Sequence, residues 1–142
     1  MVNVYETILH DESTSKIFAH NLAKTLKKSD IIAFTGDLGS GKTFLCREII
    51  QYFCGININV SSPTFNLLQT YKAPNFTIYH FDLYRLKSQN EIYELGIEDA
   101  FQNDICLIEW PQIIETIIPQ PIIKVNLEII ENNIRKCTLM RK

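Results

Sequence analysis

Apolar residues recur along this chain with two spacings, and each spacing predicts one kind of element. In the first third of the sequence, Ile17, Phe18, Leu22 and Leu26 recur at helical spacing and form the apolar face of an amphipathic helix. A compact apolar block at 31–34 is typical of a buried central strand. This part of the chain predicts a strand over 4–9, a helix over 14–27 with N-cap residues at 11–13, a strand over 31–35, and a helix over 43–53 that stops at Gly55.

The remainder of the chain predicts two hairpins, a short helix and one further strand. The segments 65–71 and 76–81 are rich in aromatic and β-branched residues. The link between them is so short that it favours an antiparallel hairpin. The other expected elements are a helix that opens on a capping box at 88–91 and ends before Gly96, an apolar strand over 105–108, and a final hairpin of 121–130 with 134–140.

These elements add up to an α/β fold in one domain over residues 1–142. The length of 142 residues suits a single domain with a core of its own. Because the strands include both hairpin partners and isolated apolar runs, we expect a mixed parallel and antiparallel central sheet flanked by helices.

The composition is that of an ordinary globular protein, with 46% hydrophobic residues, 21% charged residues and a formal net charge of −2. A free-standing nucleic-acid binder usually needs a strong basic face, so this charge argues against that class, although not against a protein that helps other subunits act on RNA. The four cysteines lack C-x-x-C spacing and are expected to be reduced thiols. We find no signal peptide and no stretch near the roughly 18 apolar residues of a membrane span, so we expect a cytoplasmic protein with no membrane contact.

The segment 36–43 carries the full pattern G-x-x-x-x-G-K-[ST] between the buried strand and the second helix. Glycines let the backbone curl so that successive N–H groups point at phosphate oxygens, and the helix N-terminus adds its positive dipole end. Lys42 is expected to reach the β- and γ-phosphates, and the Thr43 hydroxyl is a hard oxygen ligand for Mg²⁺. The expected contacts of the nucleotide in this loop are Gly39, Ser40, Gly41, Lys42 and Thr43. The fold is therefore expected to be a single P-loop NTPase domain.

Two carboxylates follow apolar strands and are candidates for supporting the metal. Asp82 comes after the strand 76–81, and Glu109 comes after 105–108. If both strands run parallel to 31–35, with 76–81 as its neighbour, their ends meet at the edge where open α/β sheets bind ligands. Each carboxylate has the alternative of a strand-end charge or a salt bridge. His80 is either an orienting group or a half-buried structural histidine, and the segment 61–64 is either a γ-phosphate sensor or a plain turn.

The ordered set of motifs resembles the bacterial TsaE (YjeE) family over about residues 11–125. The resemblance rests on the loop at 36–43 and on the segments that follow it, which are Ser62-Pro63-Thr64-Phe65, His80-Phe81-Asp82-Leu83-Tyr84-Arg85-Leu86, Glu94-Leu95-Gly96-Ile97 and Ile108-Glu109-Trp110-Pro111. Many families share the loop, but the ordered set is highly specific. Many relatives carry a second hydroxyl after the loop threonine, where this chain has Phe44.

The resemblance implies a weak, Mg²⁺-dependent ATPase that is required for making threonylcarbamoyladenosine on tRNA. In that family the protein works with a threonylcarbamoyl transferase subunit and its inactive paralogue, of the TsaD and TsaB type, and reaches tRNA through that complex. The resemblance implies Mg²⁺ at Thr43 and Glu109, and a nucleotide base near Thr14. It also implies that Asp82 is important for hydrolysis, and the residues expected to act in catalysis are Lys42, Asp82 and Glu109.

Two other functions share the loop and stay open on the sequence alone. A small-molecule kinase usually carries several arginines on a mobile lid, whereas this chain has only Arg47, Arg85, Arg135 and Arg141. A non-catalytic module could use the nucleotide as a structural switch. A GTPase is disfavoured, because the chain has no Asn-Lys-x-Asp segment to read guanine.

Overall fold

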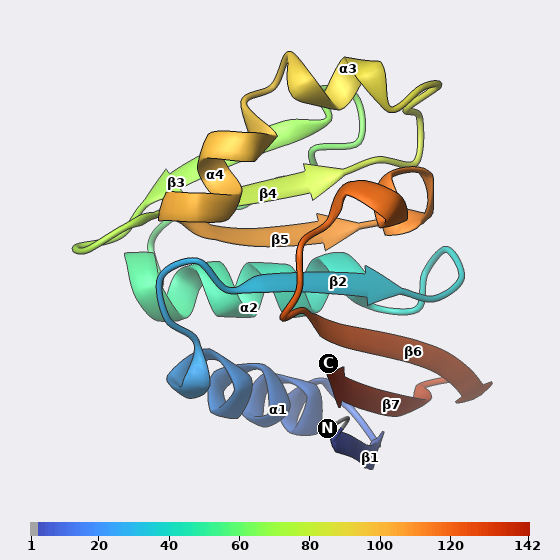
Figure 1. The fold of residues 1–142 in the computed structure, drawn as a ribbon. Helices are drawn as coiled ribbons and strands as arrows, with labels where there is room; N and C mark the ends of the chain where they lie inside the picture. The colour runs from blue at the N-terminus through green and yellow to red at the C-terminus, as the bar shows by residue number, and fades with distance from the viewer. Residues whose placement is uncertain (1–2) are drawn as a thin grey trace.

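The elements of the fold are known for residues 3–142, which a computed structural model describes (Figure 1). Their bounds, in chain order, are β1 (Asn3–Leu9), α1 (Glu12–Thr25), β2 (Ile31–Thr35), α2 (Lys42–Cys54), β3 (Leu68–Lys72), β4 (Thr77–Asp82), α3 (Asn90–Tyr93), α4 (Ile97–Asn103), β5 (Ile105–Glu109), the 3₁₀ helix η1 (Pro111–Ile117), β6 (Ile123–Glu131) and β7 (Ile134–Arg141). The described chain is thus an α/β protein, as its sequence predicts.

The seven strands form one mixed sheet in the order β1-β7-β6-β2-β5-β4-β3. β2 runs parallel to β5 and β6, and β4 runs parallel to β5, whereas β3–β4, β6–β7 and β1–β7 are antiparallel pairs. Both predicted hairpins are confirmed. The expectation that 76–81 neighbours 31–35 is wrong, because β5 lies between β4 and β2.

Helices cover both faces of the sheet, so its central strands are buried on both sides. In β2, Ile32 and Phe34 pack into the cluster that contains α1 and α2, while Ile31 and Ala33 pack into the cluster that contains α3, α4 and η1. This alternation follows from the pleat, which sends successive side chains to opposite faces. The continuous apolar run in β2 is the consequence, since neither face meets water.

The two long helices begin close to where the sequence predicts. α1 begins at Glu12 rather than at residue 14, because Asp11 is its N-cap and accepts the Thr14 N–H at 2.8 Å. α2 begins at Lys42, directly after the loop glycines, and Gly55 ends it by donating its N–H to Gln51 O at 2.9 Å.

The segments between β2 and β5 differ more from the sequence prediction. β3 begins at Leu68, not at residue 65, because Leu67 turns with a φ of 67° and donates its N–H to Pro63 O. Only the glutamate half of the expected capping box forms, with the Glu91 carboxylate accepting from the N–H groups of Lys87 and Ser88. Helix α4 and the 3₁₀ helix η1 were not predicted at all.

The carboxyl ends of β2, β4 and β5 lie at one edge of the sheet (Figure 1). Asp82 and Glu109 are the last residues of β4 and β5, rather than the first residues after them, and they face each other in the strand register. Glu109 is also in register with Phe34 of β2. The topology therefore places both carboxylates beside the glycine loop. Within residues 3–142, no helix combines the length and the apolar character needed to span a membrane.

Candidate nucleotide and magnesium site

The glycine loop joins β2 to α2 through three residues with positive φ. Gly36, Gly39 and Gly41 have φ values of 142°, 78° and 106°, in the region that favours glycine. A Cβ on Gly36 would lie 2.5 Å from the backbone oxygen of Leu127 and 2.7 Å from Ser40 Oγ. A side chain at position 36 would therefore displace β6 or the loop itself.

Lys42 lies at the start of α2 with its ammonium in the mouth of the loop. Its Nζ donates to Gly36 O at 2.7 Å and to Asp37 O at 2.9 Å, and it lies 4.2 Å from the centre of the Trp110 ring. Burial lowers the pKa of this ammonium, while the charge of Glu109 acts in the opposite direction. The cation is thus held in place by carbonyl oxygens and an aromatic face.

Thr43 and Glu109 form a direct pair between the loop helix and the centre of the sheet. The Thr43 hydroxyl donates to the Glu109 carboxylate, at 2.9 Å from Oε1 and 3.1 Å from Oε2. Glu109 is only 2% exposed. A hydroxyl and a carboxylate are the hard oxygen donors that Mg²⁺ prefers. The two residues that the sequence selects as metal ligands are therefore adjacent in space.

His80 holds the same carboxylate from the neighbouring strand β4. Its Nε2 lies 2.6 Å from Glu109 Oε2, and its Nδ1 is buried without a hydrogen-bond partner among the described residues. We assign the proton to Nε2, because a carboxylate oxygen accepts. Of the sequence alternatives for His80, an orienting role agrees with this geometry, and the side chain is fully buried rather than half-buried.

Cys46 lies behind this pair on α2, and its Sγ comes within 4.8 Å of the ligand atoms of His80 and Glu109. Burial raises the pKa of the Cys46 thiol well above its usual range, and the charges of Glu109 and Asp82 raise it further. The close His80–Glu109 contact is a hydrogen bond, which leaves Cys46 as an apolar packing group beside it.

Asp82 organises the segment that precedes β3. Its Oδ2 accepts from the Thr64 hydroxyl at 2.8 Å, and its Oδ1 accepts from the Tyr84 N–H at 3.1 Å. The Ser62 and Thr64 hydroxyls are themselves 2.7 Å apart. The segment 61–64 is therefore tied to a carboxylate at the carboxyl edge of the sheet.

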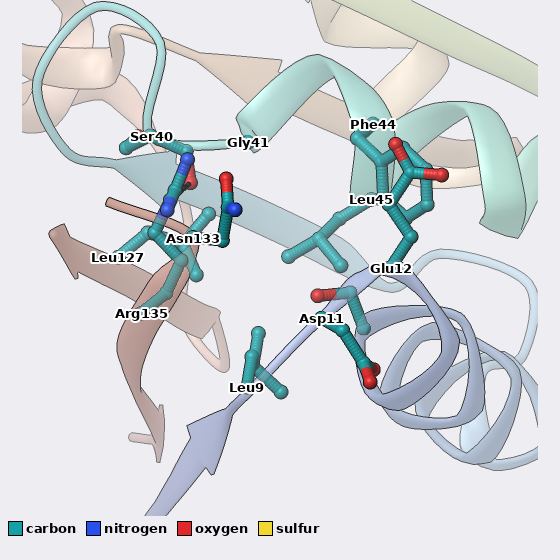
Figure 2. Close-up of a pocket in the computed structure, with 11 residues that line it drawn as sticks. Leu9, Asp11, Glu12, Ser40, Gly41, Phe44, Leu45, Leu127, Asn133 and Arg135 are labelled. Atoms are coloured by element: carbon teal, nitrogen blue, oxygen red, sulfur yellow. Dashed lines mark hydrogen bonds between the residues drawn. The ribbon is translucent and has the colours of Figure 1, made fainter. Parts of the chain in front are cut away.

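Two cavities adjoin the loop. One has a volume of about 340 Å³ and brings together the loop residues and both carboxylates; it is lined by residues that include Gly41, Lys42, Thr43, Thr64, Asp82, Glu109 and Trp110. The other, of about 420 Å³, lies between the loop, the start of α1 and the C-terminal hairpin (Figure 2). Its lining includes Asp11, Glu12, Ser40, Phe44 and Arg135.

Comparison with known proteins places this chain among relatives of one kind. The family profile described as "Threonylcarbamoyl adenosine biosynthesis protein TsaE" matches residues 9–137. The chain belongs to the TsaE family. It is 57% identical over 134 residues to the tRNA threonylcarbamoyladenosine biosynthesis protein TsaE of Rickettsia bellii, covering 94% of this chain and 93% of that protein. It is 44% identical to the protein of the same name from Haemophilus influenzae, over 80% of this chain and 72% of that protein.

A solved structure shows the same fold. The crystal structure of YdiB from Bacillus subtilis superposes with a TM-score of 0.77 at 24% identity, covering 99% of this chain and 87% of that one. The mixed sheet described above is thus a fold already seen in an experimental structure.

Thr14 is the one predicted site residue of this TsaE family member that does not line either cavity at the loop. Its hydroxyl lies 3.0 Å from Asp11 Oδ1 within the N-cap of α1, and its side chain lines a different cavity, between α1 and β1. Asp11 lines the cavity beside the loop. A role for Thr14 near a nucleotide base stays a prediction.

The sequence of this TsaE family member leaves Trp110 as either a reporter or gate of the site or an anchor against the sheet, and two contacts of the site were not predicted from it. Trp110 has a φ of 56°, rare for a residue with a side chain, and this conformation accompanies the contact of its ring with Lys42. Arg135 donates to the loop carbonyls from strand β7, far along the chain. No local pattern marks either feature, because each depends on a contact between distant segments.

Proposed function

We propose that this chain binds ATP with Mg²⁺ and hydrolyses it slowly, in support of threonylcarbamoyl transfer to adenosine in tRNA by a partner transferase complex. The observation that carries the proposal is the Thr43–Glu109 pair at the end of a complete phosphate loop, in a chain of the TsaE family. Membership of the family indicates the tRNA threonylcarbamoyladenosine pathway. The Thr43–Glu109 pair supports Mg²⁺ binding beside the phosphates.

The oxygen donors fit the proposed metal. Mg²⁺ prefers hard oxygen ligands such as hydroxyls and carboxylates. The Thr43 hydroxyl and the nearer Glu109 oxygen are separated by 2.9 Å. Bound Mg²⁺ would neutralise charge on the phosphate oxygens, and Thr43 and Glu109 would hold it.

The other residues that line the cavity with both carboxylates would bind the phosphates and orient the attacking water. Lys42 has its ammonium at the loop mouth, where it would meet the β- and γ-phosphates. Asp82 and Thr64 line the same cleft, which supports a role for Asp82 in positioning the attacking water. Arg135 is already engaged with the loop carbonyls, and Arg85 lies over the Phe65 ring at 4.5 Å. Slow hydrolysis without a partner agrees with this arrangement.

The cavity in Figure 2 supports a position for the nucleoside beside the phosphates. It adjoins Ser40 and Gly41 of the loop and is bounded by Asp11 and Phe44. Thr14, in the first turn of α1, would then stabilise Asp11 from behind through the N-cap hydrogen bonds. Thr14, which the resemblance places near the nucleotide base, would then act on the nucleoside through Asp11.

The partners that we propose are a threonylcarbamoyl transferase subunit and its inactive paralogue, of the TsaD and TsaB type. The formal net charge of −2 agrees with tRNA being bound mainly by those partners. We place the protein in the cytoplasm as part of the same proposal, because tRNA modification takes place there.

The experiment that tests the proposal is the rate of ATP hydrolysis with and without the transferase subunits. We expect a slow rate alone and a faster rate in the complex, and loss of both in the Glu109→Ala variant. Fast hydrolysis by the isolated chain would contradict the proposal, and a phosphorylated small-molecule acceptor would indicate a kinase instead. If Lys42→Ala abolished complementation in cells while Glu109→Ala preserved it, nucleotide binding alone would be the function.

A further inference from the structure

Arg135 contacts the glycine loop, which we propose binds the phosphates, from the C-terminal hairpin formed by β6 and β7. Its Nε donates to Ser40 O at 3.0 Å, and its Nη2 donates to Gly39 O at 3.2 Å. Its Nη1 donates to Asn132 O at 3.1 Å, in the turn of its own hairpin. Figure 2 shows the side chain running from the hairpin to the loop at Ser40. One guanidinium therefore joins the hairpin turn to two consecutive loop peptides.

The backbone of Arg135 is held on both sides. Strand β7 lies between β1 and β6, and Arg135 is in register with Leu9 of β1 and Ile129 of β6. A register shift in β6 between Ile129 and Glu131 lies beside it, and such bulges re-aim side chains. The guanidinium thus reaches the loop from a strand that is paired along both edges.

The two acceptor carbonyls determine where the loop N–H groups point. A peptide unit is planar and trans, so its C=O and N–H point in opposite directions. The Ser40 carbonyl shares its peptide with the Gly41 N–H, which is therefore directed away from Arg135. The Gly39 carbonyl shares its peptide with the Ser40 N–H, which donates to Asp37 O at 3.1 Å and closes the turn of the loop. Arg135 therefore binds both peptides at their carbonyl oxygens, on the side opposite their N–H groups.

Strand β6 supports the other end of the same loop. The backbone oxygen of Leu127 fills the space where a Cβ of Gly36 would lie, at 2.5 Å. Both strands of the C-terminal hairpin thus contact the phosphate loop, one at its first glycine and the other at residues 39–40.

We propose that Arg135 is a positioning residue for nucleotide binding, which holds the peptides 39–40 and 40–41 in the orientation that presents the Gly41 N–H to phosphate. This inference rests on the proposed function, because it presupposes that the loop binds the phosphates of ATP. Arginine suits the role better than lysine, because its planar fork donates along two directions at once.

The test compares two arginines of the same strand. In Arg135→Ala the loop carbonyls lose both donors, and we expect the dissociation constant for ATP with Mg²⁺, measured by calorimetry, to rise roughly ten-fold. Arg141→Ala is the matched control, since Arg141 donates instead to the Thr25 hydroxyl at 2.9 Å and should bind ATP as the wild type does. The KM for ATP should rise in Arg135→Ala by more than kcat falls. The Arg135→Lys variant should lie between the wild type and Arg135→Ala.

Each outcome separates this inference from the proposed function. If the wild type binds ATP and Arg135→Ala binds it equally tightly, the positioning role is wrong while the proposed function stands. If the wild type itself shows no binding, the proposed function fails first. If circular dichroism shows that Arg135→Ala does not fold, the ATP affinity of Arg135→Lys is the test instead, because lysine keeps the charge and the aliphatic stem. Wild-type affinity in Arg135→Lys would overturn the inference.

Discussion

The Nε2 atom of His80 lies 2.6 Å from Oε2 of Glu109, and both side chains are buried. The same carboxylate accepts the Thr43 hydroxyl. Glu109 is thus held between an imidazole on β4 and a hydroxyl on α2, with its own backbone in the central strand β5. Groups that hold a metal ligand in this way commonly set its orientation.

Replacing His80 should weaken magnesium-dependent hydrolysis. His80→Ala removes the donor to Glu109, the ligand that we propose for Mg²⁺, and we expect hydrolysis to fall about 10- to 100-fold, as for groups that orient metal ligands. His80→Gln keeps a donor of similar reach and should retain more activity. The measurement is the Mg²⁺ dependence of the ATPase rate. His20→Ala is the control, because His20 pairs with Glu48 at 3.2 Å, and an equal loss in both alanine variants would contradict the orienting role.

Gly36 should tolerate alanine far less well than Gly39. At Gly36 the added methyl would overlap the Leu127 backbone oxygen at 2.5 Å, whereas at Gly39 nothing lies within 4 Å. We expect Gly36→Ala to lower the free energy of unfolding by roughly 2–4 kcal/mol, from backbone strain and overlap together. Gly39→Ala carries only the cost of its positive φ, about 1 kcal/mol. Urea denaturation of the two variants measures the difference, and equal losses would show that the overlap is relieved.

Thr64 should matter for the hydrolytic step more than for binding. Thr64→Val keeps the shape but removes the hydroxyl that donates to Asp82 at 2.8 Å. Because Asp82 would then be free to reorient, we expect kcat to fall about ten-fold, with the ATP dissociation constant nearly unchanged. Thr77→Val, at the other end of β4, is the matched control. A loss of affinity without a loss of kcat would instead assign Thr64 to ATP binding.

Three of the four thiols should react slowly in the folded protein, and Cys54 should react before them. Burial raises the pKa values of Cys106 and Cys137 from 9.0 to about 12, so at pH 8 about one in 10⁴ of these groups is a thiolate in the folded protein. Cys46 is fully buried as well, whereas Cys54 is half-buried. Titration with a disulfide reagent at pH 8 should therefore modify Cys54 first, and all four thiols after denaturation. Because these raised pKa values favour the protonated thiols in the folded state, their contribution to stability is complete below pH 9 and is lost as the pH rises towards 12.

Much of the site follows from local sequence. The segment from β2 through the loop to α2 is specified by adjacent residues, because an apolar run, spaced glycines and a helix N-terminus each act over a few positions. The proximity of Glu109 to Thr43 could be predicted as well, because a carboxylate at the carboxyl end of a parallel strand lies at the same edge of the sheet as the glycine loop. The loop and the ends of these strands therefore agree closely with the prediction.

The parts that were missed depend on contacts between distant segments. The insertion of β5 between β2 and β4 is a matter of strand order, which hydrophobic spacing does not encode. From the sequence, a short helix was expected to end before Gly96, with no helix after it. In the structure Gly96 has a φ of 78°, and helix α4 begins directly after it. Arg135 looks like any charged strand residue, and only the folded hairpin brings it to the loop.

Trp110 should report phosphate binding through its fluorescence. It is the only tryptophan of the chain, and the Lys42 ammonium lies 4.2 Å from its ring centre. Phosphates bound in the loop would attract that ammonium and change the charge over the indole, so emission should change on adding ATP and saturate at the concentration measured by calorimetry. Adenosine, which has no phosphate, should leave the emission unchanged, and Trp110→Phe should bind ATP without a signal. An equal change with adenosine would mean that the Trp110 ring responds to the base. The emission change could then not be attributed to movement of the Lys42 ammonium.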